Sequence, residues 1–261
     1  MNASRRLFGK TLSTGLGALG VAGLSACMSP PRKAPERIQD ASRIAGLSSR
    51  ANEPKLVTGQ AWEFQATNMF NGASLGSVLH RVEASNPQEP VKLALIGEQS
   101  KRTEIYSERW RLTQEAHHDA IMRFERPVAL IPSQLTPGFE ERFSTRYVVL
   151  PDNPATPSDL TFRNLIWQVY LDVQGWETLQ VPAGRFEVAR VRRRIFFKHF
   201  DSFRAESSRL ETIWYSPQLG YWVAREWTGQ YLMQGGRRRG GLMREDWVRW
   251  ELQRVLGAPI A

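Results

Sequence analysis

The residue with the most distinctive chemistry is Cys27, the only cysteine in a chain of 261 residues. It follows Leu24-Ser25-Ala26 at the end of an N-terminal apolar segment. A lone thiol cannot form an intrachain disulfide, and covalent modification is its most plausible chemistry in this setting; a free or metal-binding thiol is the alternative. We therefore expect the folded part of the chain to depend on an ordinary core without disulfides.

The sequence Leu24-Ser25-Ala26-Cys27 resembles the lipobox of bacterial lipoproteins. The resemblance implies that the thiol receives a diacylglycerol and that residues 1–26 are then removed. Such an anchor is strong, because each buried methylene contributes ~0.8 kcal/mol and two acyl chains already hold a protein stably on a membrane. Met28, and not an aspartate, follows the cysteine. By resemblance to the enterobacterial sorting rule, this favours transfer to the outer membrane.

The segment before the lipobox is typical of an export signal. A membrane-spanning helix needs ~20 strongly apolar residues, whereas residues 11–26 are fewer, are diluted by glycine and end at small side chains. The stretch before them resembles the twin-arginine export motif, with Gly9 in place of the usual leucine, through Ser4, Arg5, Arg6, Phe8 and Lys10. That route would mean that the domain folds before export. An ordinary Sec signal that happens to contain two arginines is the alternative.

A serine in the motif Gly72-Ala73-Ser74-Leu75-Gly76 matches the G-x-S-x-G nucleophile elbow of hydrolases. An elbow joins a buried strand to a helix, whereas Asn71-Gly72 predicts a hairpin between two strands. No alternation of strands and helices follows. We therefore expect Ser74 to be an ordinary hairpin residue.

The segment Glu115-Ala116-His117-His118-Asp119 is the only cluster of metal-capable side chains in the sequence. On a strand, Glu115, His117 and Asp119 would share a face and could form a surface site for zinc or another divalent ion. Adjacent histidines without a remote third ligand are weak evidence, so a polar loop between strands is the preferred interpretation. The isolated histidines are expected to satisfy local hydrogen bonds. They are His80 and His199.

Two runs of arginine carry the densest positive charge. Residues 192–194 lie in a predicted strand, where two side chains would face one side and the third the other. The second run lies between glycine pairs, where exposed guanidinium groups could bind phosphates bidentately, with a solvated loop tip as the alternative. The candidate anion-binding residues are therefore Arg237, Arg238 and Arg239.

Composition bounds the class of protein. Removal of residues 1–26 leaves 235 residues and, with the loss of Arg5, Arg6 and Lys10, lowers the formal charge from +9 to +6. Such a charge attracts anionic headgroups or polyanions weakly and serves solubility equally, and no nucleic acid is expected as a partner outside the cytoplasm. Hydrophobic residues make up 41% of the chain, which is enough for a sizeable core. No phosphate loop, dinucleotide fingerprint or paired carboxylates are present, so no cofactor or metal is expected.

The apolar period becomes two beyond residue 56, with turn residues about every ten positions, as is typical of antiparallel strands. Residues 27–56 contain several prolines, serines and arginines without such a period and predict a flexible tether behind the lipidated cysteine. One antiparallel β-domain is expected over residues 57–261. Its strands are expected on both sides of Asn71-Gly72 and at residues 91–98, 103–110, 119–125, 141–149, 162–173, 176–181, 186–198, 210–216, 221–228, 231–234 and 242–255.

Motifs in the second half resemble a recurrent pattern of exported proteobacterial β-domains of unknown function. The pattern is a P-A-G-x-F turn followed by W-Y-x-P-x-x-G, here Pro182-Ala183-Gly184-Arg185-Phe186 and Trp214-Tyr215-Ser216-Pro217-Gln218-Leu219-Gly220. The resemblance covers roughly residues 165–227, and residues 59–64 match an opening motif of similar lipoproteins. It implies a curved antiparallel sheet or half-barrel whose concave face could hold an acyl chain.

Tryptophan is concentrated in the same half, which holds seven of the nine. An aromatic core is one explanation and an apolar ligand cavity is the other. The sequence thus predicts a non-catalytic lipoprotein of the cell envelope, facing the periplasm, that binds a lipid, a glycolipid or another envelope component on an aromatic face rimmed by arginines. The alternative is a structural or assembly subunit of an envelope complex, with an envelope protein as partner and no small-molecule ligand.

Overall fold

The computed structural model describes residues 56–85, 90–98, 100–107, 110–118, 120–150, 165–234 and 241–257. The expected signal segment, the lipobox with Cys27 and the tether up to residue 55 lie outside these residues, as does the arginine run at 237–239. The predictions made for those segments therefore stay predictions.

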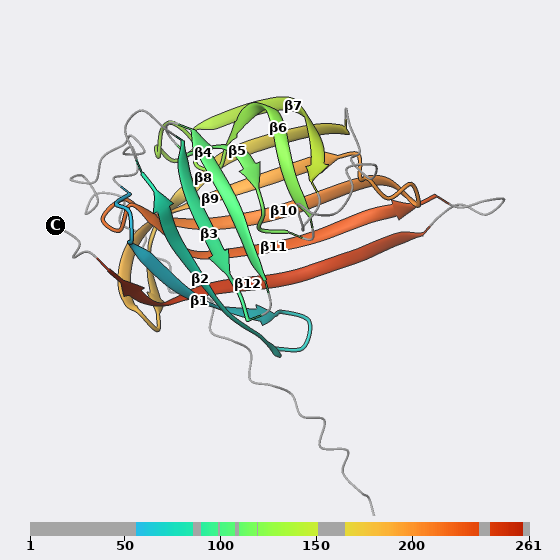
Figure 1. Cartoon of the computed structure of the whole chain (residues 1–261). Coiled ribbons are helices and arrows are strands. Elements are labelled where there is room, and N and C mark those ends of the chain that lie inside the picture. The colour runs from blue at the N-terminus through green and yellow to red at the C-terminus, as the bar shows by residue number, and fades with distance from the viewer. Residues whose placement is uncertain are drawn as a thin grey trace, which may run out of the picture. The chain divides into compact units, whose positions relative to one another are not determined.

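The described residues form a closed antiparallel barrel in which each strand is hydrogen-bonded to the next along the chain (Figure 1). Its strands, in chain order, are β1 (Ala61–Asn68), β2 (Ser74–Ala84), β3 (Val91–Ile96), β4 (Lys101–Ser107), β5 (Arg111–Glu115), β6 (Ile121–Ala129), β7 (Glu140–Leu150), β8 (Leu165–Val181), β9 (Gly184–Phe197), β10 (Arg204–Ser216), β11 (Tyr221–Met233) and β12 (Leu242–Leu256). Among these residues there is no helix of the length and hydropathy that a bilayer span requires.

Closure comes from the pairing of β1 with β12, which runs from Ala61 opposite Leu256 to Asn68 opposite Val248. The predicted antiparallel β class is confirmed, but the sheet is a complete barrel where a curved sheet or half-barrel was expected. Local periodicity carries no information on whether the first and last strands meet. Over the eight residues of β1 neither of these two strands is left as a sheet edge.

The predicted tight turns are present. Gly72, Gly184 and Gly220 have φ angles of 74°, 136° and 65°, a region that glycine enters without steric cost. The amide of Gly72 also donates to the Asn68 carbonyl in the β1–β2 turn, with an N···O distance of 2.7 Å. The Asn-Gly signal therefore marks a hairpin, as the sequence predicts.

Two strands are longer than the sequence suggests. The predicted break near Gly175 is a bulge within β8, where the register shifts between Val173 and Gly175. The predicted break in β11 is a register shift between Thr228 and Gln230. Glycine bends a strand locally without ending it. The sequence analysis also missed β5, which is only five residues long.

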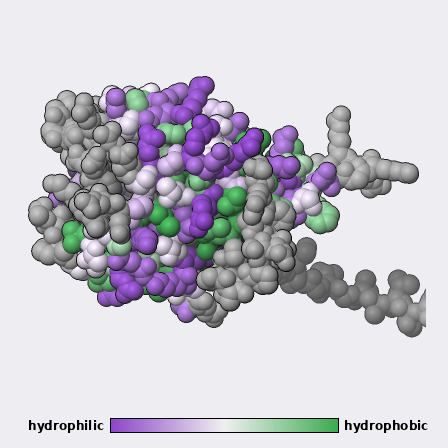
Figure 2. All heavy atoms as spheres, turned by 45° about the horizontal axis from the view of Figure 1, so that its top comes forward, coloured by the Kyte–Doolittle hydropathy of each residue, from purple (hydrophilic) through white to green (hydrophobic). Residues whose placement is uncertain are grey.

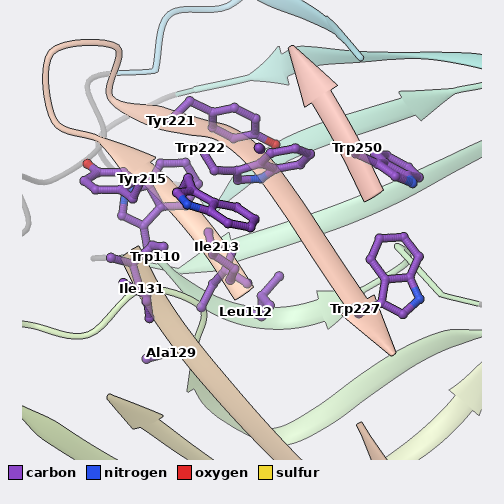
Figure 3. Close-up of a cluster of buried hydrophobic side chains, with 14 of the residues drawn as sticks. Trp110, Leu112, Ala129, Ile131, Ile213, Tyr215, Tyr221, Trp222, Trp227 and Trp250 are labelled. Carbon is purple, nitrogen blue, oxygen red and sulfur yellow. The ribbon is translucent and has the colours of Figure 1, made fainter. Parts of the chain in front are cut away.

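The interior of the barrel is filled by side chains from alternate positions of the strands. Val191, Arg193, Ile195 and Phe197 of β9 are buried, for example, whereas the residues between them are more exposed. Figure 3 shows part of this core, with aromatic and aliphatic side chains from several strands in one cluster. Its fully buried tryptophans are Trp62, Trp110, Trp167 and Trp222. Trp214, Trp227 and Trp250 are also buried, so seven of the nine tryptophans belong to the core and the explanation as an aromatic core is the one that holds for them.

Candidate functional site

A network of four charged side chains lies inside the barrel. Nη1 of Arg193 is 2.9 Å from Oε1 of Glu115 and 2.8 Å from Oε2 of Glu211. Nη2 of Arg225 is 2.9 Å from the same Glu115 oxygen and 2.7 Å from Oε1 of Glu211. All four side chains are completely buried. Each arginine thus bridges both carboxylates.

Strand pairing explains how these residues meet. Arg193 on β9 lies directly opposite Glu211 on β10, and Arg225 follows on the neighbouring strand β11. Glu115 ends β5, which pairs with β4 and β6. Since β5 is not adjacent to β9, β10 or β11 in the sheet, its contact with the two arginines crosses the interior. The network therefore ties two sides of the barrel together.

The ionisation of the network follows from its neighbours. Burial would raise the pKa of Glu115 and Glu211, but the two arginines hold the pKa of Glu115 well below and that of Glu211 below the usual value. The carboxylates in turn outweigh burial and raise the pKa of both arginines. The four groups therefore remain charged, and their net charge is zero. Pairing of this kind offsets the free-energy cost of burying the charges.

A third carboxyl group inside the barrel behaves differently. Burial raises the pKa of Glu104 to about 7, an effect that Arg225 opposes. The hydroxyl of Tyr106 donates to Oε2 of Glu104 at 2.6 Å. Glu104 is thus an interior carboxyl group whose charge changes near neutral pH.

Three histidines complete the polar interior. Burial lowers the pKa of His80 to about 3 and that of His118 to about 4, and it lowers the pKa of His117 well below its usual value. His80 shares a 2.8 Å hydrogen bond between its Nδ1 and the Tyr221 hydroxyl. Both nitrogens of His117 find no hydrogen-bond partner among the described residues. These imidazoles are therefore neutral rings packed among aromatic side chains.

Part of this cluster has the geometry of a metal site. One donor atom each of Glu115, His118 and Glu211 lies within 4.8 Å of the others. Such a set of imidazole and carboxylate ligands suits zinc. Both carboxylates, however, already bind two guanidinium groups, so a divalent cation would add charge to a balanced cluster. The arrangement favours an ion network over a metal centre.

The structure revises what the sequence suggested here. Residues 116–118 connect β5 to β6, so the expected polar loop between strands is present. Glu115, His117 and His118 are buried inside the barrel, however, so the alternative of a surface metal site is wrong; Asp119 lies outside the described residues. The arginine run 192–194 does split between faces as predicted, and its central member joins the network. In the sequence, a residue of this network can be recognised as a charged residue at a strand position whose neighbours two residues away are apolar and face the core.

Ser74 is exposed at the start of β2, and its hydroxyl oxygen accepts hydrogen bonds from Nε2 of Gln65 at 2.8 Å and from the Gly76 amide at 3.2 Å. It joins strand to strand, as the Asn-Gly turn predicted. This is not the geometry of a nucleophile elbow.

A groove of about 490 Å³ lies on the outer face of β9 to β12. Its apolar wall includes Phe196 and Leu210, whose exposed fractions of 48% and 44% are large for such side chains. Phe70, from the β1–β2 turn, packs edge-on against Trp247 with the ring centroids 5.7 Å apart. The face seen in Figure 2 shows how hydrophobic patches interrupt a largely hydrophilic surface.

Cationic side chains accompany this apolar wall. Arg194 and Arg244 are exposed and line the groove. Trp247 is held in place because its indole Nε1 donates to Oε1 of Glu226 at 2.8 Å. The groove thus offers an aromatic and aliphatic surface together with guanidinium groups, a combination suited to an amphiphilic anion. A second outer hollow, of about 480 Å³ between β6, β7 and β8, is mainly polar.

The sequence analysis placed an aromatic ligand face on the concave side of a half-barrel. The inward aromatics are core, and the groove lies on the outer side of the long strands. Its exposed apolar residues could have been recognised from their outward positions in β9 and β10.

Comparison with known proteins leaves the family open. No family model matches the sequence, and no curated protein is significantly similar to it. Among solved structures, a protein from Parabacteroides distasonis named as a lipoprotein aligns with a TM-score of 0.42 and 10% identity, over 80% of this chain and 99% of its own. The hypothetical lipoprotein YmcC from Escherichia coli aligns with a TM-score of 0.42 and 13% identity, over 78% of this chain and 86% of its own.

A protein from Bacteroides fragilis, named as exported and of YmcC-like fold, aligns with a TM-score of 0.41 and 12% identity, over 77% of this chain and 97% of its own. Likeness this distant does not establish a common function for the present chain.

Proposed function

We propose that this chain is an exported lipoprotein, anchored to the outer membrane through an acylated Cys27, whose barrel binds an anionic amphiphile such as a lipid or glycolipid without transforming it. The outer groove of β9 to β12 is the observation that supports a ligand of this class. It combines about 490 Å³ of space, within the range of small-molecule sites, with an apolar wall and exposed arginines.

The composition of the groove matches the two parts of such a ligand. Phe196, Leu210 and Trp247 offer apolar area to an acyl chain, and each buried methylene of that chain contributes ~0.8 kcal/mol. Arg194 and Arg244 offer donors to a phosphate or carboxylate. Arg237, Arg238 and Arg239 are proposed as further anion contacts on the basis of sequence alone.

The non-catalytic role is supported by where the perturbed groups lie. The described carboxyl and imidazole groups with strongly shifted pKa values are buried in the interior, where they satisfy one another or pack against aromatic rings. The groove contains arginines and hydroxyl groups but none of these shifted acids or bases. Binding, and not proton transfer, is the chemistry that this surface offers.

Titration with dodecyl phosphate below its micelle concentration tests the proposal. We expect calorimetry to detect binding to the chain from Met28 onward, and we expect Arg194→Met to weaken it about tenfold, since a hydrogen bond to a charged group contributes ~1.5–3 kcal/mol. Arg146→Met, at the polar hollow on the other side, is the matched control and should bind like the parent. Absence of binding, or equal weakening by both variants, would contradict the proposal that the groove is the ligand site.

A scaffold role in an envelope complex is the second candidate. It is favoured by the buried ion network, which links β5 to β9, β10 and β11, and by the large apolar side chains exposed on the surface of the barrel. If dodecyl phosphate does not bind, crosslinking from the position of Phe196 to envelope proteins becomes the decisive experiment.

A further inference from the structure

A ribbon of three strands projects past one end of the barrel. In β12, pairing with β1 begins at Val248, so the residues from Leu242 to Asp246 have no partner on that side. In β10, pairing with β9 begins at Ser207. The overhang of about five residues extends about 17 Å at 3.3–3.4 Å per residue. Figure 1 shows β11 and β12 running beyond the shorter strands.

The projecting end carries exposed apolar side chains. Their exposed fractions are 37% for Leu232, 43% for Met233, 60% for Leu242 and 41% for Met243. Phe203, exposed at 70%, lies beside them, because its carbonyl accepts the Gln234 amide at 2.7 Å. We call these five residues the apolar tip.

The apolar tip presents side chains on both faces of the ribbon. Leu232 lies opposite Leu242, and the next pair is Tyr231 with Met243. Successive pairs in an antiparallel ladder face opposite sides. A protein partner docks on one face of a sheet, whereas a lipid layer surrounds whatever is inserted into it. Apolar side chains on both faces therefore fit a bilayer better than a protein surface.

Neighbouring residues support the same partner. Arg204 on β10 pairs with Glu245 on β12, and its guanidinium lies 4.5 Å from the centroid of the Tyr231 ring on the intervening strand β11, which braces the ribbon. Arg244 is exposed directly beside the tip. Positive charge beside exposed apolar residues matches the surface of an anionic membrane.

We infer that the apolar tip inserts into the surface of an anionic lipid bilayer. The inference does not depend on the groove ligand, and it shares with the proposed function only the anchor that brings a membrane near. The 28 residues from Met28 to Lys55 reach ~90 Å when extended, and the 15 residues of β12 span about 50 Å. An anchor on Cys27 and the tip at the far end of β12 can therefore reach one bilayer.

Co-sedimentation with vesicles tests this inference. The chain from Met28 onward contains every strand of the closed barrel and lacks the lipid. We expect it to bind vesicles of equimolar phosphatidylcholine and phosphatidylglycerol at low salt, and to bind phosphatidylcholine vesicles at least tenfold more weakly. The double variant Leu242→Ser, Met243→Ser should lose at least tenfold of the binding to anionic vesicles.

Ile166→Ser, which changes an exposed apolar residue on the outer face of β8, is the matched control and should bind anionic vesicles like the parent. Thermal unfolding of each variant verifies that the barrel is intact. Equal binding by the parent and the double variant, equal loss in the control, or no vesicle binding by the parent would overturn the inference. Phe196→Ser distinguishes this inference from the proposed function, because the groove variant should lose binding to dodecyl phosphate and retain binding to vesicles.

Discussion

The inside of the barrel and the outer face of β9 to β12 both combine aromatic side chains with arginine. The arginines are paired with carboxylates in the first region and exposed in the second. Inside, Arg193 and Arg225 each bridge two carboxylates and leave no net charge in the network. Outside, Arg194 is exposed next to Phe196 and lines a groove. Two adjacent arginines on one strand thus have opposite environments, one buried and paired with carboxylates and the other exposed beside apolar side chains.

A run of like charges on a strand has no single role. The alternation of a strand sends successive side chains to opposite faces. The face that meets the core must compensate each charge, while the face that meets solvent keeps it available. Variants of neighbouring residues can therefore break one property without the other.

The largest expected effect comes from breaking the interior network. Arg193→Met should lower the free energy of unfolding by ~3–5 kcal/mol, because it leaves Glu115 and Glu211 with one guanidinium between them in a buried site. Arg194→Met should change it by less than ~0.5 kcal/mol, as is usual for an exposed position. Urea unfolding of both variants checks the pair. Similar losses would mean that the network is not a principal source of stability.

The interior also predicts a pH dependence. Since burial raises the pKa of Glu104 from 4.5 to about 7, its contribution to stability is greatest below pH 4.5 and is lost as pH rises through 7. The full change from this group is about 3 kcal/mol, at 1.36 kcal/mol per pKa unit. Glu104→Gln removes it.

Other interior groups act in the opposite sense. Burial lowers the pKa of His80 and His118, so the unfolded chain takes up their protons first and stability falls as pH drops below 6.5. The lowered pKa values of Glu115 and Glu211 add a further loss at more acid pH. The informative quantity is therefore the difference between the parent and Glu104→Gln. We expect the parent to lose stability relative to the variant between pH 4.5 and 7, and a constant difference would contradict a raised pKa.

A smaller effect is expected at the base of the projecting ribbon. A Cβ at Gly229 would lie 2.5 Å from Oε2 and 3.0 Å from Cβ of Glu245, so Gly229→Ala must displace a side chain that pairs with Arg204. We expect a loss of ~1–2 kcal/mol in unfolding free energy, as for other overpacked sites. Gly241→Ala, where the added Cβ meets nothing within 4 Å, is the control and should be nearly neutral. Equal effects would show that the contact with Glu245 does not matter.

The sequence allowed much of the fold to be predicted. Alternating apolar residues identified most strands, and Asn71-Gly72 and Pro182-Ala183-Gly184 identified turns, because these signals are local. Closure between β1 and β12 and the short strand β5 were not predictable in the same way. The first depends on a pairing between distant ends, and the second has too few residues for a period to show.

The candidate sites were less accessible to sequence reasoning. The interior network joins Glu115 to residues on β9, β10 and β11, which only the closed barrel brings near. Glu115 and His118 attracted attention as metal ligands, but their arginine partners could not be inferred from spacing. Alternation along β9 and β10 could have marked Phe196 and Leu210 as exposed, but their place in one groove with Trp247 depends on how β9 to β12 pair.

The nine tryptophans can show whether the ligand binds in the groove on the outer face of β9 to β12 while the interior of the barrel stays packed. Each indole N–H gives its own signal in a ¹H–¹⁵N NMR spectrum, and a titration with dodecyl phosphate follows all of them together. The outer groove predicts that the Trp247 signal shifts while those of the buried Trp62, Trp167 and Trp222 stay in place. Shifts of the buried indoles with an unchanged Trp247 would contradict this account and place the ligand inside the barrel.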